Sequence, residues 1–196
     1  GQSCISTQRL LVHRSIKDDV VTALTAAVDT QVVGDPLDEA TDVSALISTG
    51  ERDRVAGWVV EAREAGATVT TGGEIGADGV LAPTLVVDAT PDMKVCSQEV
   101  FGPVVAVTAY DDFDEALALA NDTRYGLQAG VFTADVSKAL KAARTLDFGG
   151  VLINEVPTWR ADQQPYGGLR DSGNTREGPA WSVREMTEER LIILTG

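Results

Sequence analysis

The chain has 196 residues, 43% hydrophobic and 23% charged, a composition typical of a globular protein large enough to bury a core. Its net charge of −14, without a cluster of Lys and Arg, argues against nucleic acid and anionic membranes as partners, and no apolar run approaches the ~20 residues that span a bilayer. Two cysteines and one histidine cannot build the usual zinc sites, so we expect no metal and, most simply, a reducing cytoplasmic setting.

Apolar patterns in the first part of the chain predict three strands and two helices. Short apolar runs bounded by polar or turn residues indicate strands, whereas apolar residues repeated at helical spacing indicate amphipathic helices. The expected strands lie within residues 9–14, 67–71 and 80–89, and the expected helices within residues 20–28 and 55–66. Residues 32–42 contain turn formers without a period, so we expect a loop there.

The clearest pattern lies between residues 103 and 154, where strand and helix signals alternate. Apolar runs at 103–110, 128–133 and 149–154 predict strands. Residues 111–121 begin with acidic side chains suited to a helix N-terminus, and Asp135 can cap a second helix. This β-α-β-α-β order predicts an α/β fold with an open, mostly parallel sheet, flanking helices and right-handed crossovers.

The last part of the chain begins with a long segment rich in Pro, Gly and charge, residues 155–179. Loops of this length are often functional. A short helix is expected near residues 180–186 and a strand over 190–194 (RLIIL). An apolar strand at a terminus can pair with another chain or complete the sheet of its own chain, and the pattern does not choose between the two.

Cys4 stands among small and polar residues in the sequence GQSCIST. A nucleophilic cysteine needs solvent access and an activated thiol, and this polar surrounding suits access. No obvious base adjoins Cys4, and a lone cysteine commonly packs as a small hydrophobe, so both interpretations stay open on the residues alone. Cys96 follows Val95 and precedes a predicted strand, so we expect it to be buried in the core.

Glu99 and Phe101 lie in the sequence EVFGPV, just before the strand predicted at 103–110. In an extended backbone, residues two apart point the same way. A carboxylate beside an aromatic ring would suit the ribose and base of a nucleotide, but a solvated Glu and a core Phe fit the same pattern. In the long loop, the guanidinium of Arg160 can bind a carboxylate or phosphate, or simply pack on Trp159.

Nine segments in order make the chain resemble the C-terminal, catalytic part of the NAD(P)-dependent aldehyde dehydrogenases. They are GQSC, VGDPLDEATD, GGE, LAPTLV, QEVFGPVVAV, ANDTRYGLQAGVFT, GGVLIN, PYGGLRDSGNTREG and MTEERLIIL. The sequence INEVPTWRADQQPYGG is most similar to the branch that handles small, often anionic aldehydes, such as lactaldehyde and phosphonoacetaldehyde. Ser44, Arg170 and Thr175 depart from the family pattern at loop positions, which leaves the chemistry in place.

The resemblance implies a role for each candidate residue. Cys4 matches the nucleophile, whose thiolate attacks the aldehyde carbonyl to give a thiohemiacetal and then a thioester. Glu99 matches the carboxylate that binds the nicotinamide ribose of NAD or NADP, and Phe101 matches the ring beside it. The residues expected to bind substrate are Ser3, Ile5, Trp159 and Arg160.

The resemblance also implies that part of the family's machinery lies outside this sequence. In the family the dinucleotide-binding domain, the general-base Glu and the oxyanion-hole Asn lie mostly upstream of the nucleophile, so we expect a fragment with little activity alone. Residues 1–178 would form the catalytic domain, and residues 179–196 a helix and a strand that associates in a homo-oligomer. Two rival hypotheses are a CoA-acylating aldehyde dehydrogenase and a non-catalytic fragment that acts as an assembly or interaction module.

Overall fold

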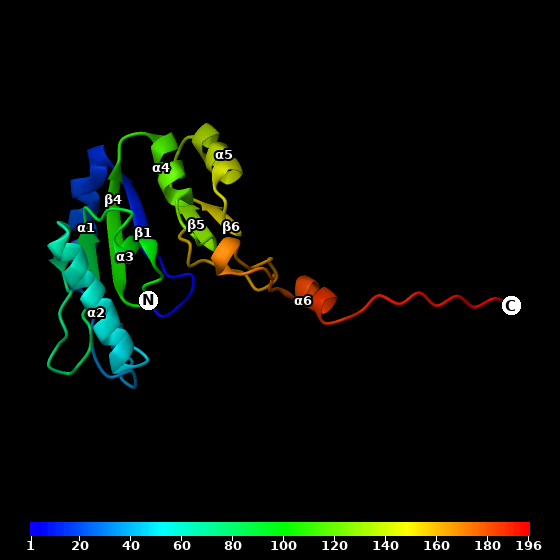
Figure 1. Ribbon diagram of the computed structural model, residues 1–196, viewed down its shortest axis with the longest axis horizontal. Coiled ribbons are helices and arrows are strands. Elements are labelled where there is room, and N and C mark those ends of the chain that lie inside the picture. The colour runs from blue at the N-terminus through cyan, green and yellow to red at the C-terminus, as the bar shows by residue number, and fades with distance from the viewer. The chain divides into compact units, whose positions relative to one another are not determined.

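The computed structural model describes residues 1–196, which divide into two compact units, Gly1–Thr123 and Arg124–Gly196. The first unit contains a four-stranded sheet and the second a two-stranded sheet (Figure 1). Both units combine strands with helices, which confirms the expected α/β class.

The first unit forms every strand and helix that the sequence predicts for it. In chain order its elements are β1 (Arg9–His13), the 3-10 turn η1 (Arg14–Ile16), α1 (Lys17–Asp29), α2 (Thr49–Glu64), β2 (Thr68–Thr71), β3 (Thr84–Val87), α3 (Lys94–Ser97), β4 (Val104–Tyr110) and α4 (Phe113–Asn121). The short helix α3 has no counterpart among the predictions. The strand order is β1-β4-β3-β2, with β1 and β3 parallel to β4 and β2 antiparallel to β3.

Strand β3 shows why helices cover both faces of this sheet. Side chains alternate between the two faces of a strand, and all four residues of β3 are buried. Val86 belongs to the core cluster that includes residues of α2 and α3, whereas Leu85 and Val87 belong to the cluster against which α1 packs. Parallel strands buried on both faces are expected to be apolar throughout, as β3 and β4 largely are.

The second unit contains β5 (Gln128–Val131), α5 (Val136–Thr145), β6 (Gly150–Ile153), the 3-10 turn η2 (Arg170–Ser172) and α6 (Pro179–Glu185). Strands β5 and β6 are parallel and are connected through α5. Asp135 caps α5 as predicted, because its Oδ1 accepts hydrogen bonds from the backbone N–H groups of Ser137 and Lys138 at 2.8 and 3.2 Å. The helix expected near residues 180–186 is confirmed as α6.

The expected mostly parallel strand pairing is confirmed, because every strand pair except β2–β3 is parallel, but β4 is not a direct neighbour of β5 or β6. Strand β4 pairs with β1 on one side and β3 on the other, so both of its hydrogen-bonding edges are occupied. Strands β5 and β6 pair with each other in a separate sheet. The local β-α-β-α-β pattern is real, but the pairing of β4 is decided by strands that come earlier in the chain.

Residues 190–194 form no strand, which corrects the expectation of one there. This segment carries hydrophobic side chains that are strongly exposed, from 71% at Ile192 to 92% at Leu194. A strand needs a neighbour for its backbone N–H and C=O groups, and neither sheet of this chain takes residues 190–194 as a partner. The segment therefore does not complete a sheet of its own chain, and its pairing with another chain stays a prediction.

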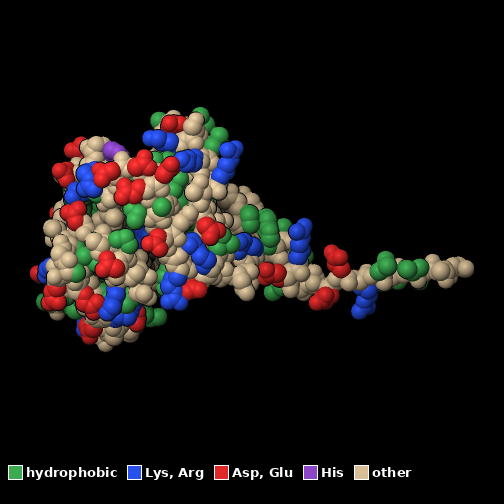
Figure 2. Space-filling view, turned by 45° about the horizontal axis from the view of Figure 1, so that its top comes forward, with side chains coloured by type: hydrophobic (Ala, Val, Ile, Leu, Met, Phe, Trp, Pro, Cys, Tyr) green, Lys and Arg blue, Asp and Glu red, His purple; other side chains and the backbone are tan.

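Acidic and basic side chains are interspersed on the face of the molecule that Figure 2 shows, and hydrophobic side chains are visible along the C-terminal segment. No helix is both long enough and apolar enough to cross a membrane.

Candidate active site

Cys4, Glu99 and Phe101 meet because β1 and β4 are neighbouring parallel strands. Arg9 of β1 pairs with Ala106 of β4, so the segments that enter these strands lie side by side at the amino ends of the strands. A small pocket of about 30 Å³ lies between the segments. Its lining residues are Gly1, Ser3, Cys4, Ser6, Thr7, Gln8, Glu99, Phe101, Gly102 and Val104.

Cys4 lies at the corner of a tight turn. The backbone N–H of Ser6 donates to the carbonyl of Ser3 at 3.0 Å, which leaves Cys4 and Ile5 at the central positions of the turn. Cys4 is exposed. Ser3 lines the pocket, whereas Ile5 is half-buried and is not among the lining residues.

The second thiol has a different environment. Cys96 is 5% exposed and belongs to the core cluster, as expected from the sequence. Burial raises the pKa of the Cys96 thiol, because a thiolate loses solvation in the core. Of the two thiols, only that of Cys4 is therefore placed where a substrate can reach it.

The turn that carries Cys4 packs directly on the segment that carries Glu99. A Cβ atom at Gly1 would lie 1.9 Å from the carbonyl oxygen of Gly102, so a larger residue at this position would displace backbone. On its other side the turn is fixed by Gln2, whose Oε1 accepts a hydrogen bond from the backbone N–H of Ile47 at 2.8 Å. The two sides of the pocket are thus held against each other by backbone contacts.

Glu99 and Phe101 are both exposed, and Val100 between them is buried at 1% exposure. Phe101 therefore does not take the core position that the sequence left open, and the backbone is not extended throughout, because Phe101 has φ of 51°. This left-handed conformation costs roughly 1–2 kcal/mol in a residue other than glycine. Backbone strain of this kind is concentrated at functional sites.

Sequence reasoning missed Arg54 of α2 as a support for this segment. Its Nη2 donates to the carbonyl oxygen of Val100 at 2.7 Å, between the two exposed residues of the site. Hydrogen bonding of a charged guanidinium to a backbone carbonyl is a comparatively strong contact. No local sequence pattern predicts this contact, because it joins Arg54 of a helix to Val100 of a loop far along the chain.

The pocket offers groups that suit the ribose and the flat base of a nucleotide. The exposed carboxylate of Glu99 can accept hydrogen bonds from ribose hydroxyls, and the half-exposed ring of Phe101 offers an apolar face to a flat group. The sequence contains no GxGxxG segment for the phosphates. No group of three or more His, Cys, Asp or Glu side chains is arranged to hold a metal ion.

Trp159 and Arg160 belong to the second unit, and the Cys4 pocket is lined by the first unit alone. The guanidinium of Arg160 lies 4.1 Å from the centroid of the Tyr166 ring and pairs with the carboxylate of Glu177 at 2.8 Å. The packing of Arg160 on Trp159 that the sequence left open is therefore replaced by packing on Tyr166. A substrate-binding role for Trp159 and Arg160 stays a prediction.

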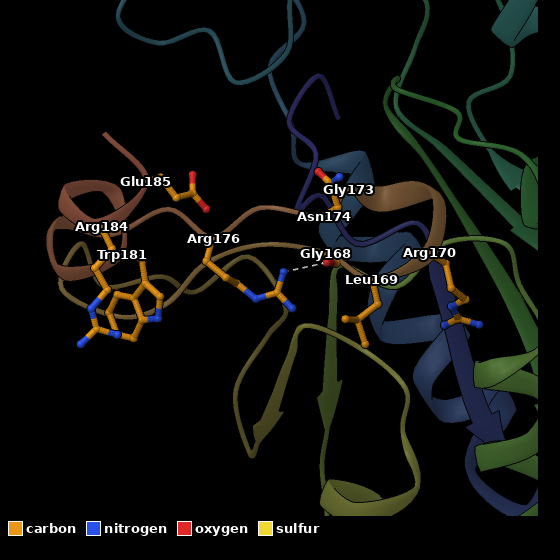
Figure 3. A pocket seen from close by; sticks show the side chains of 9 residues that line it. All are labelled: Gly168, Leu169, Arg170, Gly173, Asn174, Arg176, Trp181, Arg184 and Glu185. Atoms are coloured by element: carbon orange, nitrogen blue, oxygen red, sulfur yellow. Dashed lines mark hydrogen bonds between the residues drawn. The ribbon is translucent and has the colours of Figure 1, made fainter. Parts of the chain in front are cut away.

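A larger cavity of about 620 Å³ lies in the second unit and contains neither a thiol nor an imidazole (Figure 3). Its lining residues are Gly168, Leu169, Arg170, Gly173, Asn174, Arg176, Trp181, Arg184 and Glu185. Arg176 donates from Nη1 to the carbonyl oxygens of Gly168 and Thr175, both at 2.8 Å, and Arg170 donates to the carbonyl of Asp147 at 2.7 Å. Arg170 and Arg176 thus hydrogen-bond backbone carbonyls of their own unit. The smaller pocket, which contains the exposed thiol, remains the candidate active site.

Sequence comparison relates the chain to enzymes of one family. A profile of the aldehyde dehydrogenase family matches residues 1–192. A 3-sulfolactaldehyde dehydrogenase of Priestia aryabhattai is 48% identical over 195 residues, which cover 99% of this chain and 40% of that protein. A lactaldehyde dehydrogenase of Methanococcus aeolicus is 38% identical over 194 residues, with coverage of 99% and 41%. The chain therefore spans about two fifths of the length of these relatives.

Solved structures show the same relation. Aldehyde dehydrogenase 21 of Physcomitrella patens, in complex with the reaction product succinate, matches with a TM-score of 0.91 and 41% identity over 95% of this chain and 39% of that chain. A glyceraldehyde-3-phosphate dehydrogenase of Methanocaldococcus jannaschii complexed with NADP matches with a TM-score of 0.90 and 37% identity, over 94% of this chain and 40% of that chain.

Proposed function

The chain belongs to the aldehyde dehydrogenase family, and we propose that it supplies the nucleophile of an enzyme that oxidises a small aldehyde to a carboxylic acid with NAD or NADP. The observation that supports this proposal is the pocket in which an exposed cysteine, Cys4, and an exposed carboxylate, Glu99, lie together although they are far apart in the sequence. Since the chain spans about two fifths of its relatives, the general base and most cofactor contacts would come from a further segment.

In this mechanism the thiolate of Cys4 attacks the carbonyl carbon of the aldehyde and forms a thiohemiacetal. The oxygen that gains negative charge accepts a hydrogen bond from the backbone N–H of Cys4. The cofactor that Glu99 and Phe101 would hold would supply the acceptor for the hydride that leaves the same carbon. The carbon that has lost the hydride is then a thioester of Cys4, and attack by water releases the carboxylic acid and returns the thiol.

Glu99 and Phe101 hold the cofactor in this proposal. The carboxylate of Glu99 accepts hydrogen bonds from the nicotinamide ribose, and the ring of Phe101 lies beside it. Both groups are exposed at the pocket. The turn of Cys4 packs on Gly102, next to Phe101, so the cofactor contact and the position of Cys4 both depend on this segment.

The substrate in this proposal is a small 2-hydroxy aldehyde, as in the named lactaldehyde and 3-sulfolactaldehyde dehydrogenases. Ser3 and Ile5 flank the nucleophile and would line the aldehyde site. Trp159 and Arg160 would form its outer wall, where an anionic substrate would replace the carboxylate of Glu177 on the guanidinium of Arg160. The exposed apolar segment 190–194 would pair with a second copy of the protein.

Reduction of NAD or NADP by the full-length protein that carries this chain tests the proposal. We expect absorbance of the reduced cofactor with lactaldehyde or 3-sulfolactaldehyde, loss of turnover in Cys4→Ser, and retained turnover in the matched control Cys96→Ser. The 196-residue chain alone should show little turnover. Activity that survives Cys4→Ser would refute the proposed nucleophile. Product that forms only with CoA would point to an acylating enzyme, and a full-length protein without any turnover would favour an assembly module.

A second measurement isolates Glu99. Hydrogen bonds to a charged group contribute about 1.5–3 kcal/mol, so Glu99→Gln should weaken cofactor binding by roughly 10- to 150-fold. The alkylation rate of Cys4 should stay unchanged, because the substitution leaves the nucleophile turn in place. Unchanged cofactor binding in Glu99→Gln would show that Glu99 does not hold the ribose.

A further inference from the structure

Gln8 is the last residue before β1, and it lines the same pocket as Cys4 and Glu99. Its backbone carbonyl accepts a hydrogen bond from the N–H of Ala106 at 2.8 Å, which ties it to β4. Its side chain extends from β1 toward the segment that enters β4. Gln8 is therefore placed between the turn that carries Cys4 (the nucleophile turn, residues 3–6) and the segment that carries Glu99 and Phe101 (the cofactor segment, residues 95–101).

The side-chain amide of Gln8 makes three hydrogen bonds to the backbone of the cofactor segment. Nε2 donates to the carbonyl oxygens of Val95 at 3.0 Å and Gln98 at 2.6 Å. Oε1 accepts from the N–H of Val100 at 2.9 Å. A primary amide has two N–H donors and one carbonyl oxygen, and the surroundings of Gln8 engage all of these groups in one orientation. Rotating the amide by half a turn would place its oxygen against two carbonyl oxygens.

Two of these contacts bracket Glu99, because Gln98 precedes it and Val100 follows it. The carbonyl oxygen of Val100 has a partner of its own, because Arg54 donates a hydrogen bond to it. Glu99 has an exposed side chain on a backbone that carries no helix or strand hydrogen bonds at this point. The direction in which the carboxylate of Glu99 points thus depends on hydrogen bonds to the backbone of Gln98 and Val100.

We infer that Gln8 is a positioning residue that fixes the carboxylate of Glu99 for the cofactor and couples it to the turn of Cys4, four residues earlier in the chain. This inference rests on the proposed function. Gln8 itself contacts neither substrate nor cofactor, and it acts through the backbone on both sides of Glu99. A residue with a shorter or an apolar side chain at position 8 would leave the peptide groups of Val95, Gln98 and Val100 without these partners.

A double-mutant cycle in the full-length protein tests this role. Gln8→Met keeps the length of the side chain and removes its polar contacts, so the KM for NAD or NADP should rise about tenfold. In the Glu99→Gln background the same change should have less than about a twofold effect, because the carboxylate that Gln8 positions is gone. The matched control Gln31→Met, at an exposed site, should leave both values unchanged. An equal rise in both backgrounds, or none in either, would overturn the inference.

A readout independent of activity is amide hydrogen exchange at Val100, measured in the same variants and in the chain alone. Gln8→Met should accelerate this exchange, because the N–H of Val100 loses its acceptor. Gln8→Glu serves as a second variant, since it keeps an acceptor for Val100 but turns an oxygen toward the carbonyls of Val95 and Gln98. It should slow Val100 exchange relative to Gln8→Met and still raise the cofactor KM. Unchanged exchange in Gln8→Met would overturn the inference by itself, whereas an unaffected Glu99→Gln variant would refute the proposed function of Glu99.

Discussion

Thr84 of β3 is hydrogen-bonded to the segment that enters β4, and its replacement by Val gives a direct test of the structure. The residue is 3% exposed. Its Oγ1 donates to the carbonyl of Ala82 at 2.7 Å and accepts from the N–H of Gly73 at 2.8 Å. Its own N–H donates to the carbonyl of Pro103 at 2.8 Å, next to the glycine on which the nucleophile turn packs. Thr84→Val keeps the shape of the side chain and removes both hydroxyl contacts.

The expected cost follows from these contacts. Two net hydrogen bonds contribute about 1 kcal/mol each, and the N–H of Gly73 left without its acceptor adds about 1 kcal/mol more. Burial of one extra methyl group offsets about 0.8 kcal/mol. Thr84→Val should therefore lower the free energy of unfolding by about 2 kcal/mol. Thr84→Ser keeps both contacts and loses one buried methyl group, so it should cost about 1 kcal/mol.

Urea unfolding followed by circular dichroism measures the difference, with the free energy of unfolding obtained by linear extrapolation. Thr68→Val on β2 is the matched control, because Thr68 is exposed and its replacement should change stability by less than about 0.5 kcal/mol. If Thr84→Val proved as stable as the wild-type protein, the hydroxyl contacts would contribute no net stability, and the reasoning from buried polar groups would fail at this site.

The two thiols and one exposed ion pair give further predictions. Iodoacetamide near neutral pH should alkylate Cys4 at least ~100-fold faster than the buried Cys96, as followed by peptide mass spectrometry, and equal rates would contradict the burial of Cys96. Hydrogen bonding from Arg14, 2.7 Å away, lowers the pKa of Asp111, so an NMR titration of Arg14→Gln should show that pKa raised toward its ordinary value. Because the folded-state pKa is lowered, the ion pair is complete above the ordinary pKa of Asp and is lost as the pH falls through the folded value. A titration of Asp111 that does not change in Arg14→Gln would refute this pairing.

The local elements could be predicted from the sequence because each depends on residues close in the chain. Asp112 illustrates this, since its carboxylate caps α4 in a capping box with Glu115, where the sequence shows an acidic first turn. The short helix α3 escaped prediction because its four residues carry no helical period. The order of the strands in the sheet could not be predicted either, because the pairing of β4 with β1 joins residues that are far apart in the sequence.

The candidate site was accessible to sequence reasoning only in part. The residues alone left Cys4 open between nucleophile and bystander, and it took the resemblance to a family to assign it a role. The structure adds that Cys4 is exposed and shares a pocket with Glu99. Gln8 and Arg54 had no signal in the sequence, because a polar residue at the start of a strand and an Arg on a helix are both common. Their importance depends on which backbone groups the fold places opposite them.

The Cys4 pocket lies at the end of the sheet opposite to the one where ligands of α/β proteins commonly bind. In open α/β sheets ligands commonly bind at the carboxyl ends of the strands. At that end of β1 and β4 lie His13, Tyr110 and Asp111, where His13 bonds the carbonyl of Asp111 at 3.1 Å and Asp111 pairs with Arg14. His13 and Arg14 both bind Asp111, and none of these residues lines the Cys4 pocket. Cys4 and Glu99 instead lie at the amino ends, where two segments enter adjacent parallel strands. Those segments lack the backbone hydrogen bonds that fix the strands of a sheet. Hydrogen bonds from side-chain amides, such as that of Gln8, therefore fix their backbone instead.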